Sequence, residues 1–215
     1  MFEPRYTITN EILNKIAEIE TLRSQVARTR ILPERAIELH YRATVEKVFS
    51  STSIEGNPLT RKQVDSVLGS QTRTLTRRKY AEIEVHNYKN ALDYIDKRKL
   101  TGALPDYDEL LKLHRLAMEG LLPETKTGAL RAGPIYIIDQ DENLKYTGPG
   151  AKSVMKKLEE LIVWVNDSKD VHPCIVAAIL HFQFVSIHPF SDGNGRAARL
   201  LTMLYLGTRD YDFNG

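Results

Sequence analysis

Apolar residues recur every three or four positions along most of this 215-residue chain, which is the spacing of helices that bury one face. Residues 8–28 show this pattern, and a second amphipathic helix is predicted from Pro33 to about Phe49, because proline favours the first turn of a helix. The other predicted helices are a short one ending near Gly69, a long one through Tyr88, Leu92 and Ile95, and further ones over 107–120, 151–166, from 173 toward 188, and 196–207.

Two sequence signals mark the beginnings of predicted helices. Thr60 followed by Gln63 matches a capping box, and Asp106 followed by Glu109 caps the segment YDELLKLHRLAMEG. In each pair a side chain accepts a hydrogen bond from an amide of the first turn that has no partner within the helix. Gly120 then predicts the end of the second of these helices.

One segment breaks the helical pattern. Between Gly128 and Pro149 the sequence has a β-prone run, a polar turn and a second short extended piece, which together predict a β-hairpin. It is the only strand signal of this strength in the sequence. The predicted fold class is therefore all-α, a helical bundle with one small β-hairpin.

The sequence predicts one packed unit. It shows no internal repeat, low-complexity tract or linker, and 215 residues with 42% apolar content suffice for one core. We expect residues 1–70 to form N-terminal helices that pack as one globular unit with a core of residues 71–215. The helix from Pro173 is apolar on nearly every face, so we expect it at the centre of that unit.

Composition and charge argue against several classes of function. Thirty basic and 28 acidic side chains nearly cancel, so the net charge does not indicate binding to nucleic acid or to an anionic membrane. The N-terminus lacks the apolar stretch of a signal peptide, and polar residues interrupt the longest apolar run before it could span a bilayer. The single cysteine, Cys174, excludes an intrachain disulfide and is expected to be a small buried residue. A cytoplasmic location fits these features.

Chemically active residues are densest in HPFSDGNGRAAR, residues 188–199. This stretch joins two predicted helices, and Gly193 and Gly195 allow backbone angles and close ligand contacts that other residues obstruct. The positive N-terminal end of the last helix points at the same place. Arg196 and Arg199 share one face of that helix. The segment is therefore predicted to bind anions, with two fork-shaped donors for successive phosphates.

The same segment carries an acid and a base. Asp192 would repel a bare phosphate, but it fits if a hard cation lies between them, and Mg²⁺ commonly binds one carboxylate together with nucleotide phosphates. His188 supplies a base that works near neutral pH. We infer a site for nucleotide phosphates and Mg²⁺.

Each of these residues alone has an ordinary structural explanation, because His-Pro turns and Asn-Gly loops are often structural only. GNGRAA also satisfies the dinucleotide pattern G-x-G-x-x-A, but that fingerprint requires a βαβ unit, for which the sequence lacks strand signals. Six matched groups within twelve residues favour the phosphate site.

The segment resembles the signature of the Fic family, H-P-F-x-[DE]-G-N-G-R-x-x-R, and matches it at every specified position. The resemblance extends upstream through HRLAMEGL, the RAGPIYI hairpin and the apolar helix before His188, so it covers the chain from about Ser51 onward. It implies a mostly helical core with a β-hairpin flap. It also implies an activity, the transfer of AMP from ATP to a hydroxyl side chain of a target protein.

The resemblance also assigns roles within the signature. It implies that His188 deprotonates a Ser, Thr or Tyr of the target, that Asp192 holds Mg²⁺ across the α- and β-phosphates, and that Arg196 holds the β-phosphate. The α-phosphate would be held by Gly193, Asn194 and Gly195. Phe190, the apolar residue of the motif, is expected to anchor the loop in the core.

A second stretch, SSTSIEGN, is similar to the inhibitory motif of the family, [ST]-x-x-x-E-[GN], with Ser51, Glu55 and Gly56 in register. By itself it would pass as a helix end with a glycine cap. The resemblance implies that Glu55 pairs with Arg199 and occupies the place of the ATP γ-phosphate. A carboxylate matches a guanidinium fork much as the edge of a phosphate does, so the chain is expected to inhibit itself.

Three alternatives remain open. Some relatives with this arrangement also remove AMP by using the glutamate to orient a water, so the first alternative is a de-AMPylase or a bifunctional enzyme. The second is a catalytically silent binding scaffold, although silent members usually lose the histidine or the glycines. The third is a nucleic-acid-binding module, suggested by TRTLTRRK, which lacks stacking aromatics and an overall basic balance.

The predicted hairpin, from Gly133 to Tyr146, suggests how a target is held. An exposed strand edge pairs with an extended segment through main-chain hydrogen bonds. We therefore expect Ile135, Tyr136 and Ile137 to position the target hydroxyl without recognising a particular sequence. The expected partners are ATP and a protein with a hydroxyl side chain, which includes the chain itself, and a homodimer is also among the expectations.

Overall fold

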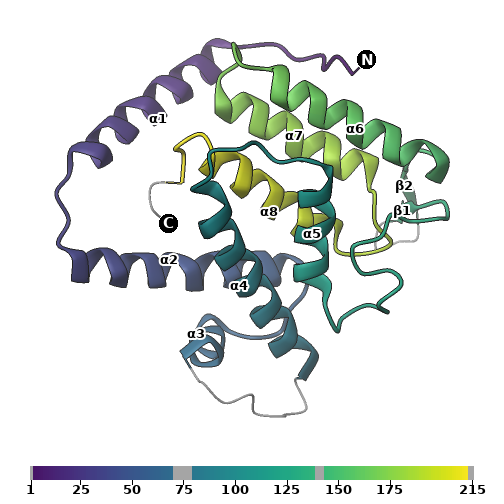
Figure 1. Ribbon diagram of the computed structural model, residues 1–215, viewed down its shortest axis with the longest axis horizontal. Helices are drawn as coiled ribbons and strands as arrows, with labels where there is room; N and C mark the ends of the chain where they lie inside the picture. Colours follow the sequence, from purple (N-terminus) through teal and green to yellow (C-terminus); the bar gives the residue numbers. More distant parts are fainter. Residues whose placement is uncertain (1, 70–78, 139–142, 213–215) are drawn as a thin grey trace.

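The computed structural model describes residues 2–69, 79–138 and 143–212. Within these ranges the chain forms eight α-helices and one two-stranded sheet (Figure 1). The helices are α1 (Asn10–Arg28), α2 (Pro33–Ile54), α3 (Arg61–Gly69), α4 (Lys79–Lys99), α5 (Tyr107–Met118), α6 (Ala151–Asp167), α7 (Pro173–Ile187) and α8 (Asn194–Gly207). The strands β1 (Tyr136–Ile138) and β2 (Leu144–Thr147) pair antiparallel. The predicted all-α class with one hairpin is confirmed, whereas nearly all of the basic segment TRTLTRRK lies outside the described residues.

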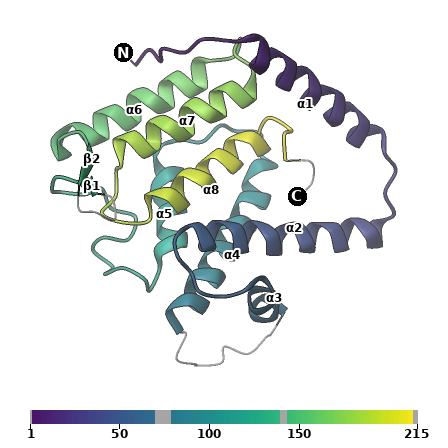
Figure 2. The ribbon, with the colours of Figure 1, turned by 180° about the vertical axis from the view of Figure 1, so that it is seen from behind.

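α8 lies at the centre of the helical core. It packs against α2, α4, α5 and α7, and Figures 1 and 2 show it between the α6–α7 pair and the α4–α5 pair. Nine of its 14 residues are buried. They include the four predicted to face inward, Leu200, Leu201, Leu204 and Tyr205. The residues at the start of α8 are therefore carried by a helix that is held from several sides.

The prediction that the helix from Pro173 lies at the centre is wrong. α7 buries one side through residues such as Leu180 and Phe184, but Phe182 on another side is 66% exposed. Cys174, expected to be buried, is partly exposed. The reason is that α7 lies one layer outside α8, with α6 against it, so part of its surface meets solvent.

α1 has the helical spacing predicted for residues 8–28, yet none of its residues is buried. Its apolar side chains Leu13 and Leu22 are about half exposed. Among the described residues, Glu20 links α1 to the rest of the chain: its carboxylate accepts a hydrogen bond from the Tyr211 hydroxyl and lies 3.3 Å from His172 Nε2. Figure 1 shows α1 and α2 diverging from their short connection. α1 therefore contributes little to the core.

The predicted helix caps are confirmed. Thr60 N donates to Gln63 Oε1 at 2.9 Å, and Gln63 N donates to Thr60 Oγ1 at 3.4 Å. Glu109 N donates to Asp106 Oδ1 at 2.8 Å at the start of α5. None of the helices in the described ranges combines the length and the apolar character needed to cross a bilayer.

α2 is longer than the pattern predicts. It continues past Phe49 into the SSTSI stretch, because Ser51 and Thr52 are buried against the core. Glu55 is the C-cap, and Gly56 has a φ of +87°, the left-handed conformation that favours glycine at helix ends. The extra turn brings the end of α2 into contact with α8.

Candidate active site

A left-handed turn joins α7 to α8 and carries the signature residues. His188 ends α7 with a φ of +50°, and Gly193 precedes α8 with a φ of +75°. Gly193 also has no room for a side chain, because a Cβ there would lie 2.6 Å from Met118 Sδ and 3.2 Å from His114 Nε2. Non-glycine residues rarely adopt the conformation of His188, so its backbone is strained. The turn therefore packs directly on α5.

His188 presents one ring nitrogen as a base. Its Nδ1 lies 3.2 Å from the Val185 carbonyl oxygen. Because a carbonyl only accepts hydrogen bonds, Nδ1 carries the proton and Nε2 has the free lone pair. Burial lowers the pKa of His188 below its ordinary value, and the charge of Arg131 also lowers it. The imidazole is therefore neutral and able to accept a proton at neutral pH.

Asp192 offers one outward-facing carboxylate. Its side chain is 53% exposed, its Oδ1 accepts from the Gly193 amide at 2.5 Å, and Arg196 Nη2 lies 3.5 Å from the same oxygen. No three His, Cys, Asp or Glu side chains within the described ranges cluster closely enough to hold a metal by themselves. One carboxylate suits Mg²⁺, which takes its remaining oxygen ligands from water and phosphate. The residue present therefore fits the metal that the resemblance implies.

The first residues of α8 leave amides for an anion. The amides of Asn194 and Gly195 have no partner within the helix, whose first backbone bond runs from Ala197 N to Gly193 O at 3.0 Å. The Asn194 side chain is already engaged, because Oδ1 accepts from Phe190 N and Nδ2 donates to Phe190 O, both at 2.9 Å. Asn194 therefore braces the turn with its side chain and has its backbone amide to offer a phosphate.

Arg196 is buried and paired. It is 4% exposed, and its Nη1 donates to Glu84 Oε1 on α4. Glu84 Oε2 also accepts from the side-chain amide of Asn57 at 2.7 Å. Arg196 Nε is buried without a hydrogen-bond acceptor among the described atoms. Nη2 lies 3.5 Å from Asp192 Oδ1, so Nη2 is the donor placed for a ligand.

Arg199 joins α8 to the end of α2. Its Nε donates to Ser51 Oγ at 2.7 Å, and its Nη2 donates to the Ser51 carbonyl at 3.1 Å and to Glu55 Oε1 at 2.7 Å. The Glu55 carboxylate also lies against Gly195, since a Cβ at Gly195 would overlap Oε1. A negative charge therefore occupies the positive N-terminal end of α8.

The turn rests on two stacked rings. Phe190 is fully buried, as predicted, and its ring is nearly parallel to that of His114, with centroids 3.6 Å apart. The Gly128 amide donates to His114 Nδ1 at 2.9 Å, so the ring proton is on Nε2, which donates to the Asp192 carbonyl at 3.0 Å. Burial lowers the pKa of His114 to about 4, so this ring is neutral near pH 7.

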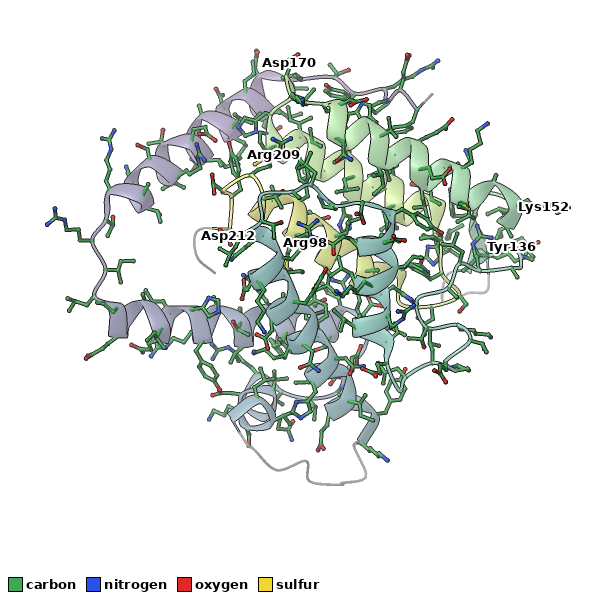
Figure 3. The ribbon with its side chains drawn as sticks, in the orientation of Figure 1. Arg98, Tyr136, Lys152, Asp170, Arg209 and Asp212 are labelled. Atoms are coloured by element: carbon green, nitrogen blue, oxygen red, sulfur yellow. The ribbon has the colours of Figure 1, made fainter. Side chains whose placement is uncertain are left out.

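The hairpin lies beside the turn (Figure 1), and the Tyr146 hydroxyl anchors it by donating to the Ser186 carbonyl at 2.6 Å. Gly148 N donates to Ile135 O at 3.1 Å, and the hydrogen-bonding direction alternates along an antiparallel strand. The main-chain groups of Ile137 therefore face β2, and those of Tyr136 face the outer edge. Tyr136 is 58% exposed and lies at the periphery of the molecule in Figure 3. Of the three residues expected to position a target, Tyr136 thus has the outward amide.

Comparison with known proteins identifies the family. The model of the Fic/DOC family matches residues 104–206, which include the hairpin, the turn and nearly all of α8. A protein adenylyltransferase Fic from Drosophila willistoni is 32% identical over 166 residues, and one from Nematostella vectensis is 25% identical over 197 residues. The chain belongs to the Fic/DOC family.

These relatives are longer than this Fic chain. The two alignments cover 74% and 90% of this chain but 31% and 44% of the relatives. A solved Fic family protein from Desulfovibrio desulfuricans G20 has a TM-score of 0.77 and 31% identity, over 95% of this chain and 60% of that chain. A solved structure of Fic-1 from Caenorhabditis elegans has a TM-score of 0.76 and 25% identity, and the match covers 93% of this chain and 60% of that chain. The chain thus spans less than half the length of the two curated relatives.

Sequence reasoning missed three residues that shape this Fic site, Glu84, His114 and Arg131. Glu84 and His114 did carry a signal, because each lies within the buried stripe of its helix, where a polar side chain requires a partner. Arg131 lies in an irregular segment before β1, where no periodic pattern marks burial.

The buried His114 predicts a pH dependence of stability. The unfolded chain binds a proton on this histidine near pH 6.5, whereas the folded protein does so only near pH 4, so the unfolded state holds more protons between these values. His114 therefore contributes stability above pH 6.5 that is lost as the pH falls toward 4, by about 3 kcal/mol in total.

Urea unfolding of the wild type and of His114→Gln, from neutral pH down to pH 4, measures the contribution of His114 to the free energy of unfolding. The free energy of unfolding of the wild type minus that of the variant should fall by about 3 kcal/mol on acidification, because the other titrating groups are common to both proteins. A constant difference across this range would contradict the prediction.

Proposed function

We propose that this chain is a protein adenylyltransferase, which transfers AMP from ATP to a Ser, Thr or Tyr hydroxyl of a target protein. The observation that carries the proposal is the turn that joins a neutral imidazole, His188, to the available amides at the start of α8. A base and an anion site close together suit attack by a hydroxyl on a phosphate. The names of the relatives as protein adenylyltransferases support the same reaction.

In the proposed reaction His188 Nε2 accepts the proton of the target hydroxyl as its oxygen attacks the α-phosphorus. The bond from that phosphorus to the bridging oxygen of pyrophosphate breaks, and AMP remains on the target oxygen. The amides of Asn194 and Gly195 donate to the α-phosphate, where charge develops. Asp192 would hold Mg²⁺, which would supply positive charge to the phosphates and to the leaving pyrophosphate.

Arg196 is assigned to the β-phosphate. Glu84 holds one side of the guanidinium through Nη1, so the side chain is ordered before ATP binds, which reduces the entropy lost on binding. Nη2, which lies 3.5 Å from Asp192 Oδ1, is on the side of the proposed Mg²⁺ and is suited to a phosphate oxygen. The arrangement supports stabilisation of the leaving pyrophosphate.

Ser51, Glu55 and Gly56 are assigned to inhibition. Glu55 would compete with the γ-phosphate of ATP for Arg199 and for the positive end of α8. A partly buried pair of this type contributes about 1–3 kcal/mol, which corresponds to about ten- to a hundredfold weaker productive ATP binding. Ser51 adds acceptors that hold Arg199 in place, and Gly56 ends the helix at the position that the contact requires.

The same contact supports a second candidate, the hydrolytic removal of AMP. The Glu55 carboxylate lies at the start of α8, beside the proposed site of the α-phosphate, where a carboxylate could orient a water for attack. We propose that either direction operates in the cytoplasm, which the use of ATP and the single cysteine support.

Replacing Glu55 tests the inhibitory assignment. Glu55→Gly should raise AMP transfer at least tenfold, because Arg199 and the end of α8 become available to the γ-phosphate. Transfer is measured with Mg²⁺ and α-labelled ATP on a cell lysate and on the protein itself. Glu46→Gln is the control, since it removes an exposed carboxylate of the same helix that pairs with Arg61, whereas Arg199 pairs with Glu55. If Glu55→Gly changes neither ATP affinity nor transfer, the inhibitory assignment is wrong.

Replacing His188 tests the base. In the Glu55→Gly background, His188→Ala should reduce transfer to background while ATP affinity changes by less than about threefold, because a base acts on the chemical step. Calorimetric titration with ATP and Mg²⁺ gives the affinity, and labelling gives the rate. Transfer that persists in the double variant would exclude His188 as the base.

The hairpin edge is tested at Tyr136. Tyr136→Pro removes an outward amide and should lower transfer to protein targets about tenfold or more, with ATP affinity unchanged. Tyr136→Ala is the matched control, since it loses the side chain but keeps the amide. Ile137→Pro, whose amide faces β2, should instead weaken the hairpin itself. Labelled bands of equal intensity with Tyr136→Pro and Tyr136→Ala would refute edge pairing.

A further inference from the structure

Arg131 connects the hairpin to the catalytic turn through main-chain oxygens. It is 7% exposed. Its Nε donates to the His188 carbonyl at 2.7 Å, and its Nη1 donates to the Gly133 carbonyl at 2.7 Å. Its Nη2 donates to the Pro149 carbonyl at 2.6 Å and to the Ile187 carbonyl at 3.3 Å. One guanidinium thus joins both ends of the hairpin to the last residue of α7 and to the proposed base.

The backbone of Arg131 strengthens the same connection. Its amide donates to the Pro189 carbonyl at 2.9 Å. Gly148, at the other end of the hairpin, has no room for a side chain, since a Cβ there would lie 2.6 Å from Ile135 Cγ2 and 3.3 Å from Arg131 Nη2. The two ends of the hairpin therefore close tightly around the guanidinium.

The partners of this guanidinium are unusual for a buried charge. All of its hydrogen bonds end on neutral carbonyls, and no carboxylate of the described residues forms an ion pair with it. Burying a charge without a counter-charge is unfavourable. The four carbonyls offset part of this cost through hydrogen bonds, so the planar fork points to a role in placing them relative to one another.

We infer that Arg131 is a positioning residue that fixes the hairpin relative to His188, so that a hydroxyl presented by the hairpin edge meets Nε2. The inference rests on the proposed function for its catalytic meaning. The geometry has a simple basis, because a rigid guanidinium that binds four carbonyls sets their mutual distances, which a flexible lysine cannot do.

The charge of Arg131 adds a second effect. Arg131 lowers the pKa of His188 in addition to the larger effect of burial, while the hydrogen bond to Val185 and the charges of Asp192 and Glu55 raise it. Removing the Arg131 charge should therefore raise the pKa of His188. The base would then become protonated, and transfer would fall, at a higher pH than in the parent protein.

Two substitutions in the Glu55→Gly background separate the positioning effect of the Arg131 side chain from the effect of its charge on His188. Arg131→Lys keeps the charge but loses the fork, whereas Arg131→Met loses both. Arg98→Lys is the matched control, because Arg98 also binds main-chain carbonyls and is mostly buried, but pairs with Glu109 away from the turn. Figure 3 shows Arg98 far from the hairpin residue Tyr136.

We expect Arg131→Lys to raise KM for a protein target at least tenfold while the Kd for ATP changes less than twofold. Amide exchange in β1 and β2 should accelerate in both Arg131 variants and stay unchanged in Arg98→Lys. The acidic limb of the pH profile of kcat/KM should move to higher pH in Arg131→Met and stay in place in Arg131→Lys. Replacing a residue with a merely structural role would leave the acidic limb of the kcat/KM profile in place. It would also leave unchanged the ratio of the KM for the protein target to the Kd for ATP.

The outcomes distinguish this inference from the proposed function. If the parent Glu55→Gly protein transfers no AMP, the proposed function fails, and exchange in the hairpin still tests the connection made by Arg131. If the parent is active but both Arg131 variants retain hairpin protection and target KM, the inference is wrong. If Arg131→Met does not fold, the comparison of Arg131→Lys with Arg98→Lys still tests the inference. Equal changes of target KM and of hairpin amide exchange in these two variants would overturn the positioning role of Arg131.

Discussion

The left-handed turn between α7 and α8 is held by contacts to its backbone, and the rest of the site depends on this. The Asn194 side chain closes the turn from within. His114 holds the Asp192 carbonyl from α5, and Arg131 holds the His188 carbonyl from the hairpin side. Because these supports act on main-chain atoms, the side chains of His188 and Asp192 remain available for a proton and a cation. Strain at His188 is thus balanced by the contacts that its surroundings make with the backbone of the turn.

The two signature arginines belong to one hydrogen-bonded network with the end of α2. Arg199 contacts Glu55 directly. Arg196 contacts the same segment through Glu84, which also binds Asn57, two residues after Glu55. Displacing this segment would therefore alter the surroundings of both proposed phosphate ligands at once. The network also explains why a carboxylate such as Glu84 lies within the buried face of α4.

Local signals in the sequence predicted most of the elements, because caps, glycines and helical spacing act over a few residues. The start of α5 at Asp106 and the inward face of α8 are examples. The exposure of Phe182 and of α1 could not be predicted, since burial depends on which neighbour covers a face. The same limit applies to Arg131, two of whose carbonyl partners lie 18 and 56 residues away along the chain. Phe190 was predicted because one motif contains both the turn and its anchor.

The contact between Glu55 and Arg199 joins residues 144 positions apart in the sequence. The proposed inhibition and the proposed chemistry are therefore encoded in separate stretches, so a point mutation near residue 55 would alter the first without changing the second. Glu55 is also the last residue before a glycine with open space around it, so a change confined to residues 53–55, past the buried Thr52, would withdraw the carboxylate while the buried part of α2 remains in place.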